Sequence, residues 1–435
     1  MRHGNLWKEK RRDKGVKTKA VRLYGEMDLR LEEFDLPEMR DDEILARVMS
    51  DSLCTSTYKA VKQGSAHKRV HEDVAEHPAI VGHEFCGEVV KVGAKWAEEF
   101  KPGDRFIIQP ALNYKGSLDA PGYSYDTIGG DATYVVIPNE VMEMKCLIPF
   151  EGSGFFEGSM TEPYSCVIGT FHAMYHTEYG SYVHQMGIRK GGNMLMLAGN
   201  GPMGQAAIDY ILHCDRRPGL LVVTGRRQEQ LDRLVQLLTA EDAAANGVSL
   251  HYFNTATCED AKAELLALSG GKGYDDVLVF TPVASMVELG DDLLGKDGCL
   301  NFFSGPSDKD FKAQLNFYNV HYAFTHIVGT SGGNTDDMKE AAAMMKEGKI
   351  NPALLVTHVG GLNDVAEATK HLPEIRGGKK LIYPWVDMPL TAIADFEKLG
   401  KEDPFYAELD AICKKHNGLW SVEAEQYLLK TKAGL

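Results

Sequence analysis

The 435-residue sequence has few cysteines for its length and no Cys-x-x-Cys pair. Closely spaced cysteines build the disulfide frameworks of small secreted domains, so the sequence excludes that class of protein. Scattered thiols are typical of a reducing compartment, and we expect a cytoplasmic protein. The eight cysteines stand at positions 54, 86, 146, 166, 214, 258, 299 and 413.

Positive charge is also scarce, because 47 lysines and arginines face 62 aspartates and glutamates, a formal net charge of −15. A general nucleic-acid-binding surface needs clustered lysine and arginine, so we expect no nucleic-acid partner. The exception is the start of the chain, where residues 1–20 hold eight basic and two acidic residues. No apolar stretch follows, so this start does not resemble a secretory signal. We interpret residues 1–19 as a solvated basic extension.

The sequence lacks a hydrophobic run suited to crossing a membrane. One uncharged run, Gly191 to Ile208, is long enough to be considered, but the glycines and proline in its middle would break a spanning helix. We therefore expect no membrane partner. The remaining composition, with 44% hydrophobic and 25% charged residues, is that of a globular protein. At about 100–200 residues per domain, the length predicts two or three domains.

The chain has two regions with different sequence patterns. Short β-branched runs between turn residues fill residues 20–150, which predicts a β-rich domain with a barrel-like sheet. From Glu162 onward strands alternate with helices, which is typical of βαβ units in a parallel sheet covered on both faces. Strand-like runs return after Asn351, and a polar helical tail follows. The predicted strands are Ala20–Tyr24, Glu43–Val48, Gly87–Val92, Arg105–Gln109, Ala132–Ile137, Asn193–Ala198, Leu220–Thr224, Asp276–Phe280, Cys299–Phe303, Ile327–Gly329, Leu354–His358 and Lys380–Tyr383, and the predicted helices are Tyr164–Tyr179, Met203–Cys214 and Gln228–Leu238.

The first motif that carries chemistry is a Gly-x-Gly-x-x-Gly turn at residues 199–204, directly after a predicted strand and at the start of a predicted helix. In that setting the glycines make a tight turn and let the backbone approach a pyrophosphate, which the free N–H groups of the helix then hold. A plain turn between packed elements is the alternative. We assign this turn to a dinucleotide cofactor, with Gly199, Gly201, Pro202, Met203 and Gly204 as binding residues.

The next strand predicts which nicotinamide cofactor is preferred. It ends at Gly225-Arg226-Arg227, where an NAD-specific site would carry an Asp or Glu for the ribose 2′-hydroxyl. Here the acid is missing and two guanidinium groups follow, a combination that suits a 2′-phosphate. We therefore predict NADP(H) in preference to NAD(H). The alternative is a pair of solvated arginines at the start of a helix.

A second motif predicts a metal site. Cys54 lies upstream of Gly82-His83-Glu84, and Cys, His and carboxylate are the ligand types that zinc uses in catalytic sites with an open position. Taken singly, His83 is more typical of a hydrogen-bonded structural histidine, and Cys54 of a small buried apolar residue. The combination within a β-rich domain favours a catalytic metal.

Together, these motifs resemble the zinc-dependent medium-chain alcohol dehydrogenase family, over residues 20–385. In that family a Cys-x-Ser/Thr segment and a Gly-His-Glu-x-x-Gly segment precede the Gly-x-Gly-x-x-Gly turn. The resemblance implies a GroES-like β-rich catalytic domain and a Rossmann cofactor domain with a doubly wound parallel sheet. It divides the chain into the extension (1–19), the first part of the catalytic domain (20–180), the cofactor domain (181–349) and the returning catalytic part with its tail (350–435).

The resemblance also implies roles in zinc binding. Cys54 and His83 would be zinc ligands, and Glu84 would be a ligand or lie just behind the metal. A further ligand falls in the segment Thr161–Ser165, where we prefer Glu162, and Cys166 is the competitor. His172 and His176 could mimic a metal pair on a helix face, but their counterparts in the family are not ligands, so we expect them to serve packing.

The sequence departs from the family pattern in two places. The four-cysteine lobe that holds structural zinc in many members is absent, because Ala111–Gly130 contains no cysteine, so we expect one zinc per chain. The histidine that ends the proton relay of some members is replaced by Tyr58 and Lys59. Only Ser56, the first step of that relay, carries over.

Several segments resemble the ketose phosphate reductases of this family. This implies reversible reduction of L-sorbose 1-phosphate to glucitol 6-phosphate, and a homodimer or homotetramer built through the cofactor domain. The segments lie at residues 51–54, 64–70, 316–322, 329–333 and 388–396.

A phosphorylated substrate needs cationic partners, and we assign that role to Lys68 and Arg69, beside His67. A charged surface loop is the alternative for this segment. For the whole chain, one alternative is a polyol or threonine-type dehydrogenase that uses NAD(P) on an unphosphorylated substrate. Another is a non-catalytic nucleotide-binding protein, against which the retained zinc-ligand residues argue.

Overall fold

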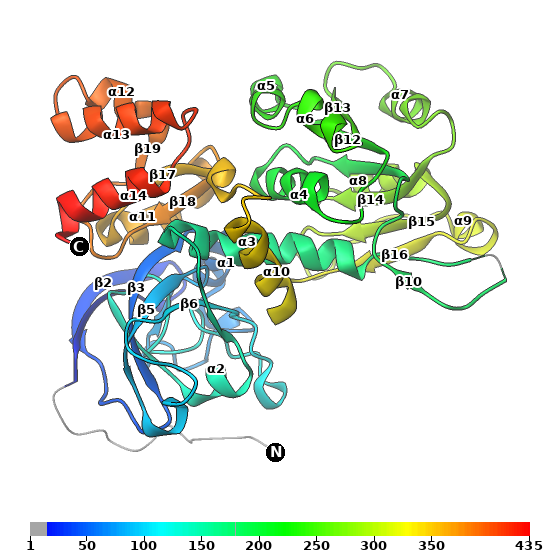
Figure 1. The fold of residues 1–435 in the computed structure, drawn as a ribbon. Coiled ribbons are helices and arrows are strands. Elements are labelled where there is room, and N and C mark those ends of the chain that lie inside the picture. The colour runs from blue at the N-terminus through cyan, green and yellow to red at the C-terminus, as the bar shows by residue number, and fades with distance from the viewer. Residues whose placement is uncertain (1–14, 179) are drawn as a thin grey trace. The chain divides into compact units, whose positions relative to one another are not determined.

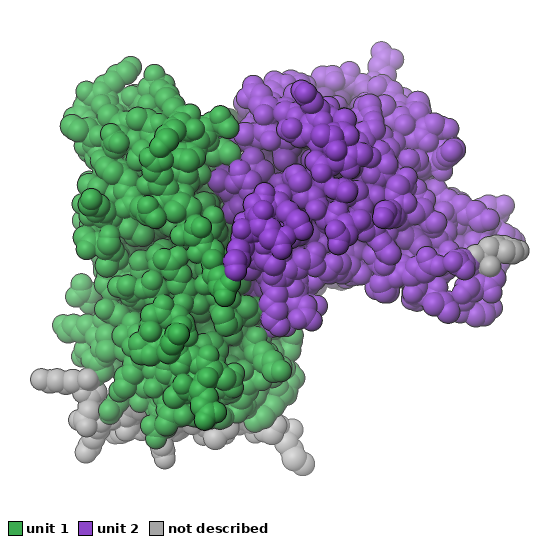
Figure 2. All heavy atoms as spheres, in the orientation of Figure 1, with its two compact units in different colours: residues 1–160, 356–435 green, residues 161–355 purple. Residues whose placement is uncertain are grey.

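The chain forms two compact units, and the computed structural model describes residues 15–178 and 180–435 (Figure 2). Unit 1 combines residues 1–160 with 356–435, and unit 2 contains residues 161–355. Of the basic extension expected over 1–19, residues 1–14 lie outside the described residues, and strand β1 (Lys17–Gly25) begins shortly after them. No helix among the described residues is long and apolar enough to cross a membrane.

Unit 1 is built on a sheet with the strand order β19-β17-β18-β3-β5-β6-β8, in which β7 also pairs with β3. Strand β3 (Ile44–Ser52) is central, because it pairs antiparallel with β5 (Cys86–Val92), β7 (Tyr134–Ile137) and β18 (Lys379–Ile382). The returning segment thus completes a sheet begun by the first third of the chain (Figure 1). The other strands of unit 1 are β2 (Asp28–Asp35), β4 (Ala79–Ile80), β6 (Arg105–Ile108), β8 (Leu147–Pro149), β17 (Val356–Gly360) and β19 (Thr391–Ala392).

The main core of unit 1 comes from alternating apolar positions of these strands. Ile44, Ala46 and Val48 of β3 all point into one buried cluster, as the period-two alternation of a strand predicts, and Leu45 on the other face belongs to a second buried cluster. Phe85 and Phe106 meet edge to face in the same cluster, with ring centroids 6.2 Å apart. This packing fixes the start of β5, and therefore the loop of residues 81–85 that precedes it.

Unit 2 is a doubly wound parallel sheet, as expected. Its strand order is β13-β12-β11-β14-β15-β16, in which the chain starts in the middle and winds outward to each edge. All five strand pairings are parallel. The sequence analysis did not identify the edge strand β13. The strands are β11 (Asn193–Leu197), β12 (Leu220–Gly225), β13 (Ser249–Asn254), β14 (Tyr274–Val279), β15 (Leu294–Phe302) and β16 (His326–Gly329), and the helices include α4 (Pro202–His213), α5 (Gln228–Leu237), α7 (Ala261–Leu268), α8 (Ala284–Asp292), α9 (Phe317–Tyr322) and α10 (Thr335–Lys346).

Helix α3 (Phe155–Ala173) differs from the helix predicted over Tyr164–Tyr179. The observed helix begins nine residues earlier, at Phe155, and continues through Pro163. The helix ends before residue 175 because Tyr175–His176 form strand β9, which pairs with β10 (Gln185–Met186).

The C-terminal tail provides the cap for the start of α3. Glu425, on helix α14 (Val422–Leu428), accepts hydrogen bonds from the backbone N–H groups of Phe155 and Phe156 at 2.7 and 2.8 Å. It also accepts one from the hydroxyl of Tyr383 at 2.9 Å. The tail, which includes α13 (Pro404–Lys415), therefore belongs to the structure of unit 1.

Candidate metal and cofactor sites

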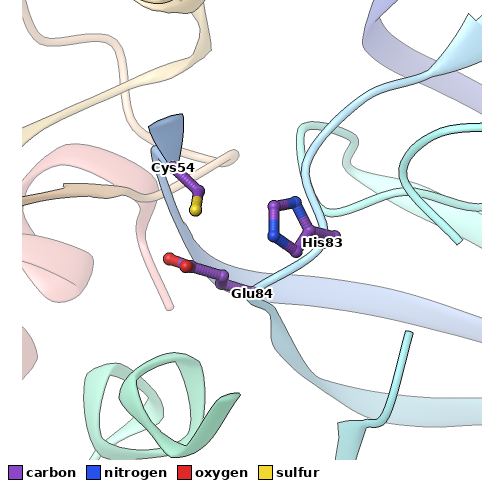
Figure 3. A group of neighbouring side chains, drawn as sticks. All are labelled: Cys54, His83 and Glu84. Carbon is purple, nitrogen blue, oxygen red and sulfur yellow. The ribbon is translucent and has the colours of Figure 1, made fainter. Parts of the chain in front are cut away.

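Three predicted ligands lie together in unit 1. The ligand atoms of Cys54, His83 and Glu84 are all within 4.8 Å of one another, and their side chains point toward a common space in Figure 3. His83 and Glu84 are buried, and Cys54 is partly exposed. Thiolate, imidazole and carboxylate form a donor set that suits zinc, so the residues present fit the metal that the sequence predicts.

Local backbone geometry explains how these side chains meet. Cys54 is the N-cap of helix α1 (Thr55–Gln63), and its Sγ accepts from the Ser56 N–H at 3.5 Å. His83 and Glu84 follow Gly82, whose φ of +91° lies in the left-handed region. A Cβ atom at Gly82 would also lie 2.2 Å from Oδ2 of Asp51. Glycine is therefore required for the turn that presents His83.

The imidazole of His83 has a partner at each nitrogen. Nδ1 lies 3.0 Å from the Thr57 hydroxyl, and Nε2 lies 3.2 Å from the Tyr123 hydroxyl. Burial lowers the pKa of His83 to about 4, so the ring is neutral near pH 7, which is the form that binds metals. The sequence analysis identified neither Thr57 nor Tyr123. A hydrogen bond to one ring nitrogen orients a histidine ligand, which is the role that Thr57 can fill.

Glu84 is held by residues from two other strands. Lys379 Nζ donates to its two oxygens at 2.5 and 2.6 Å, and the Ser52 hydroxyl donates to Oε2. Burial alone would raise the pKa of this carboxyl, but the ammonium of Lys379, His83 and the Ser52 hydroxyl together outweigh burial and lower the pKa below its usual value. Glu84 is thus an ionised carboxylate at the edge of the site.

A pair of buried aspartates stands behind the Gly82 turn. Asp51 Oδ1 accepts from the Glu84 N–H at 3.0 Å, and Asp131 lies on the same side of Gly82 as Asp51, because a Cβ atom at Gly82 would lie 3.0 Å from Asp131 Cγ. Burial raises the pKa of Asp131 to about 8. Burial also raises the pKa of Asp51, and the neighbouring charge of Asp131 raises it further. These groups support the loop that carries His83.

The basic segment predicted to bind phosphate lies close to the metal-binding group. The guanidinium of Arg69 stands over the Tyr123 ring, 5.4 Å from its centroid, and the His83 ring is 4.8 Å from the same centroid. Arg69 and His83 therefore lie beside the same aromatic ring. Lys68 is exposed. Burial lowers the pKa of His67 to about 4, helped by Arg69 and Lys68, so His67 is neutral near pH 7.

Ser56, the predicted relay residue, lies in the first turn of α1, two residues after Cys54, and is exposed. Tyr58 and Lys59, which replace the second relay residue, are half-buried on the same helix.

The predicted further ligand belongs to unit 2. Glu162 lies on α3, and Oε1 accepts from Cys166 Sγ at 3.4 Å, so the two competitors are direct neighbours. Their placement at the metal stays a prediction. His172 and His176 are not a pair on one helix, because α3 ends at Ala173.

The two histidines have separate partners. The Nδ1 atom of His172 lies 2.8 Å from Asp337 Oδ1, whereas Nε2 of His176 lies 3.0 Å from Asp276 Oδ1.

The glycine-rich turn in unit 2 has the predicted setting, between β11 and α4. A Cβ atom at Gly204 would lie 1.9 Å from the Gly199 carbonyl oxygen, so the helix packs against the turn at a distance that only glycine allows. A Cβ atom at Gly201 would meet nothing within 4 Å, so the middle of the turn is open. Pro202 is the first residue of α4, where its missing N–H leaves no partner unsatisfied.

Beyond β12, the residues predicted to select the cofactor are accessible. Arg226 and Arg227 are exposed and precede α5. Gly225 is buried, and a Cβ atom there would lie 2.7 Å from Cγ of Asn200. Asn200 belongs to the glycine-rich turn and was not singled out from the sequence.

Comparison with known proteins identifies the family of this chain. Residues 40–146 match the alcohol dehydrogenase GroES-like domain. The chain is 53% identical to L-sorbose 1-phosphate reductase from Klebsiella pneumoniae, over 95% of this chain and 97% of that protein. It is 48% identical to mannitol-1-phosphate 5-dehydrogenase from Aliivibrio fischeri, over 95% and 98%. A sorbitol dehydrogenase from Halalkalibacterium halodurans is 26% identical over 65% and 76%.

Solved structures share the fold. The 2R,3R-butanediol dehydrogenase of Bacillus subtilis superposes with a TM-score of 0.67 at 21% identity, covering 84% of this chain and 99% of that chain. A zinc-binding dehydrogenase from Sinorhizobium meliloti, bound to NADP, also gives 0.67 at 19% identity, covering 85% and 100%.

Proposed function

Since this chain belongs to the zinc-type medium-chain dehydrogenases, enzymes that act on CH–OH groups, we propose that it reduces a ketose phosphate with NADPH, reversibly. L-sorbose 1-phosphate is the proposed substrate, and glucitol 6-phosphate is the product. Two of the three relatives described above support a phosphorylated substrate, because they are named for phosphorylated sugars or polyols and match at 53% and 48% identity. The structural observation that carries the proposal is the position of Arg69, which lies beside the same Tyr123 ring as His83.

The proposed ligands of a single zinc are Cys54, His83 and Glu162, with Glu84 as a further ligand or an anion just behind the metal. Zinc, when bound, supplies a Lewis acid that polarises the substrate carbonyl, and the nicotinamide supplies the hydride. Thr57 orients the His83 ring, and Lys379 compensates the charge of Glu84.

Reduction adds a hydride to the carbonyl carbon and a proton to its oxygen. Ser56 is the proposed proton donor, because its hydroxyl lies beside Cys54 on the exposed side of α1. Solvent then returns a proton to the Ser56 hydroxyl, which it reaches directly because the residue is exposed.

The position of Arg69 favours a substrate whose phosphate is near its carbonyl. In L-sorbose 1-phosphate the phosphate is on C1, next to the C2 carbonyl. In fructose 6-phosphate, which oxidation of mannitol 1-phosphate at C5 would give, the phosphate is at the opposite end of the sugar. A guanidinium can hold phosphate oxygens with two parallel hydrogen bonds, and Lys68 adds a point charge from the exposed side.

For the cofactor we propose NADP(H) in preference to NAD(H). The pyrophosphate would lie at the turn formed by Gly199, Gly201, Pro202, Met203 and Gly204. The residues after Gly225 supply no carboxylate for a ribose 2′-hydroxyl, and the exposed Arg226 and Arg227 can approach a 2′-phosphate.

We also propose a homo-oligomer that associates through β16, the edge strand of the parallel sheet. Large apolar side chains are exposed on the neighbouring helix α9, where Phe317, Tyr318 and Tyr322 are 72%, 68% and 63% exposed. Apolar surface beside an open strand edge is typical of an association site. Light scattering of the intact protein would give the number of chains, and a monomer at all concentrations would contradict this proposal.

The decisive experiment is to measure NADPH oxidation by the zinc-loaded protein with L-sorbose 1-phosphate, fructose 6-phosphate and free L-sorbose. We expect kcat/KM for L-sorbose 1-phosphate to exceed that for the free sugar by about 100-fold, the contribution of one or two charge-assisted hydrogen bonds. A preference for fructose 6-phosphate would contradict the proposed phosphate position. Equal rates with L-sorbose 1-phosphate and the free sugar would favour the polyol dehydrogenase alternative, to which the sorbitol dehydrogenase match points.

A further inference from the structure

An amide bridge joins the glycine-rich turn to the first turn of α5. The side-chain Nδ2 of Asn200 donates to Oε1 of Gln230 at 2.6 Å. Both residues are half-buried, and Asn200 lies next to Gly225 at the end of β12. The turn is the proposed pyrophosphate site, and α5 follows directly after Arg226 and Arg227.

The bridge fills the space that a side chain at position 225 would need. A Cβ atom at Gly225 would lie 2.7 Å from Cγ, 2.9 Å from Cβ and 2.9 Å from Nδ2 of Asn200. These distances are below van der Waals contact, and the Asn200 side chain is fixed by its hydrogen bond to Gln230. An aspartate at residue 225, the group an NAD-specific site uses, therefore cannot be accommodated while Asn200 is present.

The surrounding polar groups are also uncharged amides. Asn254, paired with Gly225 across β12 and β13, donates through Nδ2 to Gln228 Oε1 at 2.8 Å. The strand ends thus present amides at positions 200, 228, 230 and 254 to the place where the adenosine ribose binds in a doubly wound fold, with the guanidinium groups of Arg226 and Arg227 beside them.

We infer that Asn200 is a specificity-determining residue for the cofactor: it excludes an acid from position 225 and, through Gln230, fixes the start of α5 so that Arg226 and Arg227 face a 2′-phosphate. This inference rests on the proposed preference for NADP(H). Asn200 is one of the variable positions of the Gly-x-Gly-x-x-Gly turn, and the inference gives it a role in the choice of cofactor.

The test is equilibrium binding of NADPH and NADH to the full-length protein, followed by the fluorescence of the reduced nicotinamide, in four proteins. These are the wild type, Asn200→Ala, Gly225→Asp and the double variant Asn200→Ala/Gly225→Asp. Gln236→Ala is the matched control, because it removes an exposed amide from the last turn of the same helix. Thermal unfolding of each variant shows whether it is folded.

We expect Asn200→Ala to weaken NADPH binding by about fivefold, the effect of one lost hydrogen bond that positions a charged group, and to leave NADH binding unchanged. Gly225→Asp should lose affinity for both cofactors because the aspartate clashes with Asn200. The double variant should regain NADH binding to above the wild-type level. Gln236→Ala should bind both cofactors like the wild type.

Equal weakening of both cofactors by Asn200→Ala would overturn the inference, since it would show only a structural role in the turn. Tight NADH binding by Gly225→Asp alone would also overturn it. If Asn200→Ala does not fold, Asn200→Ser replaces it and is expected to show a smaller shift of the same sign. A wild type that binds NADH as tightly as NADPH would contradict the proposed cofactor preference, whereas the two aspartate variants would still decide whether Asn200 excludes an acid.

Discussion

Lys379 and Glu84 form a buried ion pair in which Nζ lies 2.5 and 2.6 Å from the two carboxylate oxygens. The side chains are 8% and 1% exposed. The pair joins the loop that carries His83 to β18, a strand that the chain reaches only after it has formed unit 2. Both charges are far from water, so each depends on the other for compensation.

Removal of the cation should therefore be costly. We expect Lys379→Met to lower the free energy of unfolding by about 3–5 kcal/mol, because it leaves Glu84 charged and buried. Urea unfolding of the metal-free protein would measure this. The matched control is Lys370→Met, which breaks the exposed pair with Glu367 and should cost less than about 1 kcal/mol. Equal effects of the two variants would contradict the role of Lys379, and Glu84→Gln in the Lys379→Met background should recover part of the loss.

The hydroxyl of Thr57 should determine how well His83 binds metal. Thr57→Val removes the hydrogen bond to Nδ1 at nearly constant volume, and we expect zinc affinity to fall by about 10-fold to 100-fold, as for other residues that orient histidine ligands. Competition with a chromophoric chelator would give the affinity. Thr55→Val, an exposed change on the same helix, should leave it unchanged. An unchanged affinity in Thr57→Val would show that the ring is oriented by other contacts.

Arg69 and Lys68 offer a paired test of phosphate recognition. Arg69→Ala should raise KM for L-sorbose 1-phosphate by about 10-fold to 100-fold and leave kcat/KM for free L-sorbose unchanged, because only the phosphate loses charge-assisted hydrogen bonds. Lys68→Ala should have a smaller effect, because its side chain is exposed. If both sugars lose activity equally in Arg69→Ala, the arginine supports Tyr123 and does not bind phosphate.

The proton relay can be tested at Ser56. Ser56→Ala should lower kcat by about 100-fold, within the range of general acid–base catalysis, with no change in zinc content. Thr55→Ala is the neighbouring control. A kcat unchanged within a factor of about two would show that solvent delivers the proton without Ser56.

The tail should make stability depend on pH. Burial raises the pKa of the Glu425 carboxyl from 4.5 to about 7, although the N–H groups of Phe155 and Phe156 lower it. A carboxyl whose pKa is higher in the folded than in the unfolded state stabilises the fold at low pH, and this contribution is lost as the pH rises from about 4.5 to about 7. The wild type should therefore lose about 3 kcal/mol over this window relative to Glu425→Gln. The free energy of unfolding would be measured with urea at several pH values. If Glu425 were not responsible, it would change with pH in parallel in the wild type and in Glu425→Gln.

Local sequence patterns identified much of the site. His83 and the turn around Gly201 lie beside glycines, which a tight backbone turn requires. The residue types alone therefore indicated both positions. Lys379, Tyr123 and Thr57 were not identified, because their partners are fixed by the tertiary fold: Lys379 lies 295 residues from Glu84 in the sequence. The signal that could have indicated Lys379 was a lysine in a buried strand.

The start of α3 was missed for the same reason. A helix start is recognised in a sequence by a capping side chain that lies close to it along the chain. The acceptor that caps the true first turn is Glu425, 270 residues downstream of Phe155. The strand β13 was missed because its exposed edge carries polar residues such as Ser249 and His251, which weaken the apolar pattern.

The discontinuous composition of unit 1 affects how the chain must fold during synthesis. Residues 161–355 are contiguous and can fold as one unit when they emerge, whereas β3 waits for β18 and the first turn of α3 waits for Glu425. At about 5–20 residues per second, roughly 10–40 s pass between the end of the first segment of unit 1 and the start of the second. During that interval Asp51 and Ser52, at the end of β3, lack their partners in β18, whereas Ile44 to Arg47 can already pair with β7. Nascent chains of this protein should therefore be most exposed to chaperones, proteases and aggregation at this stage of translation.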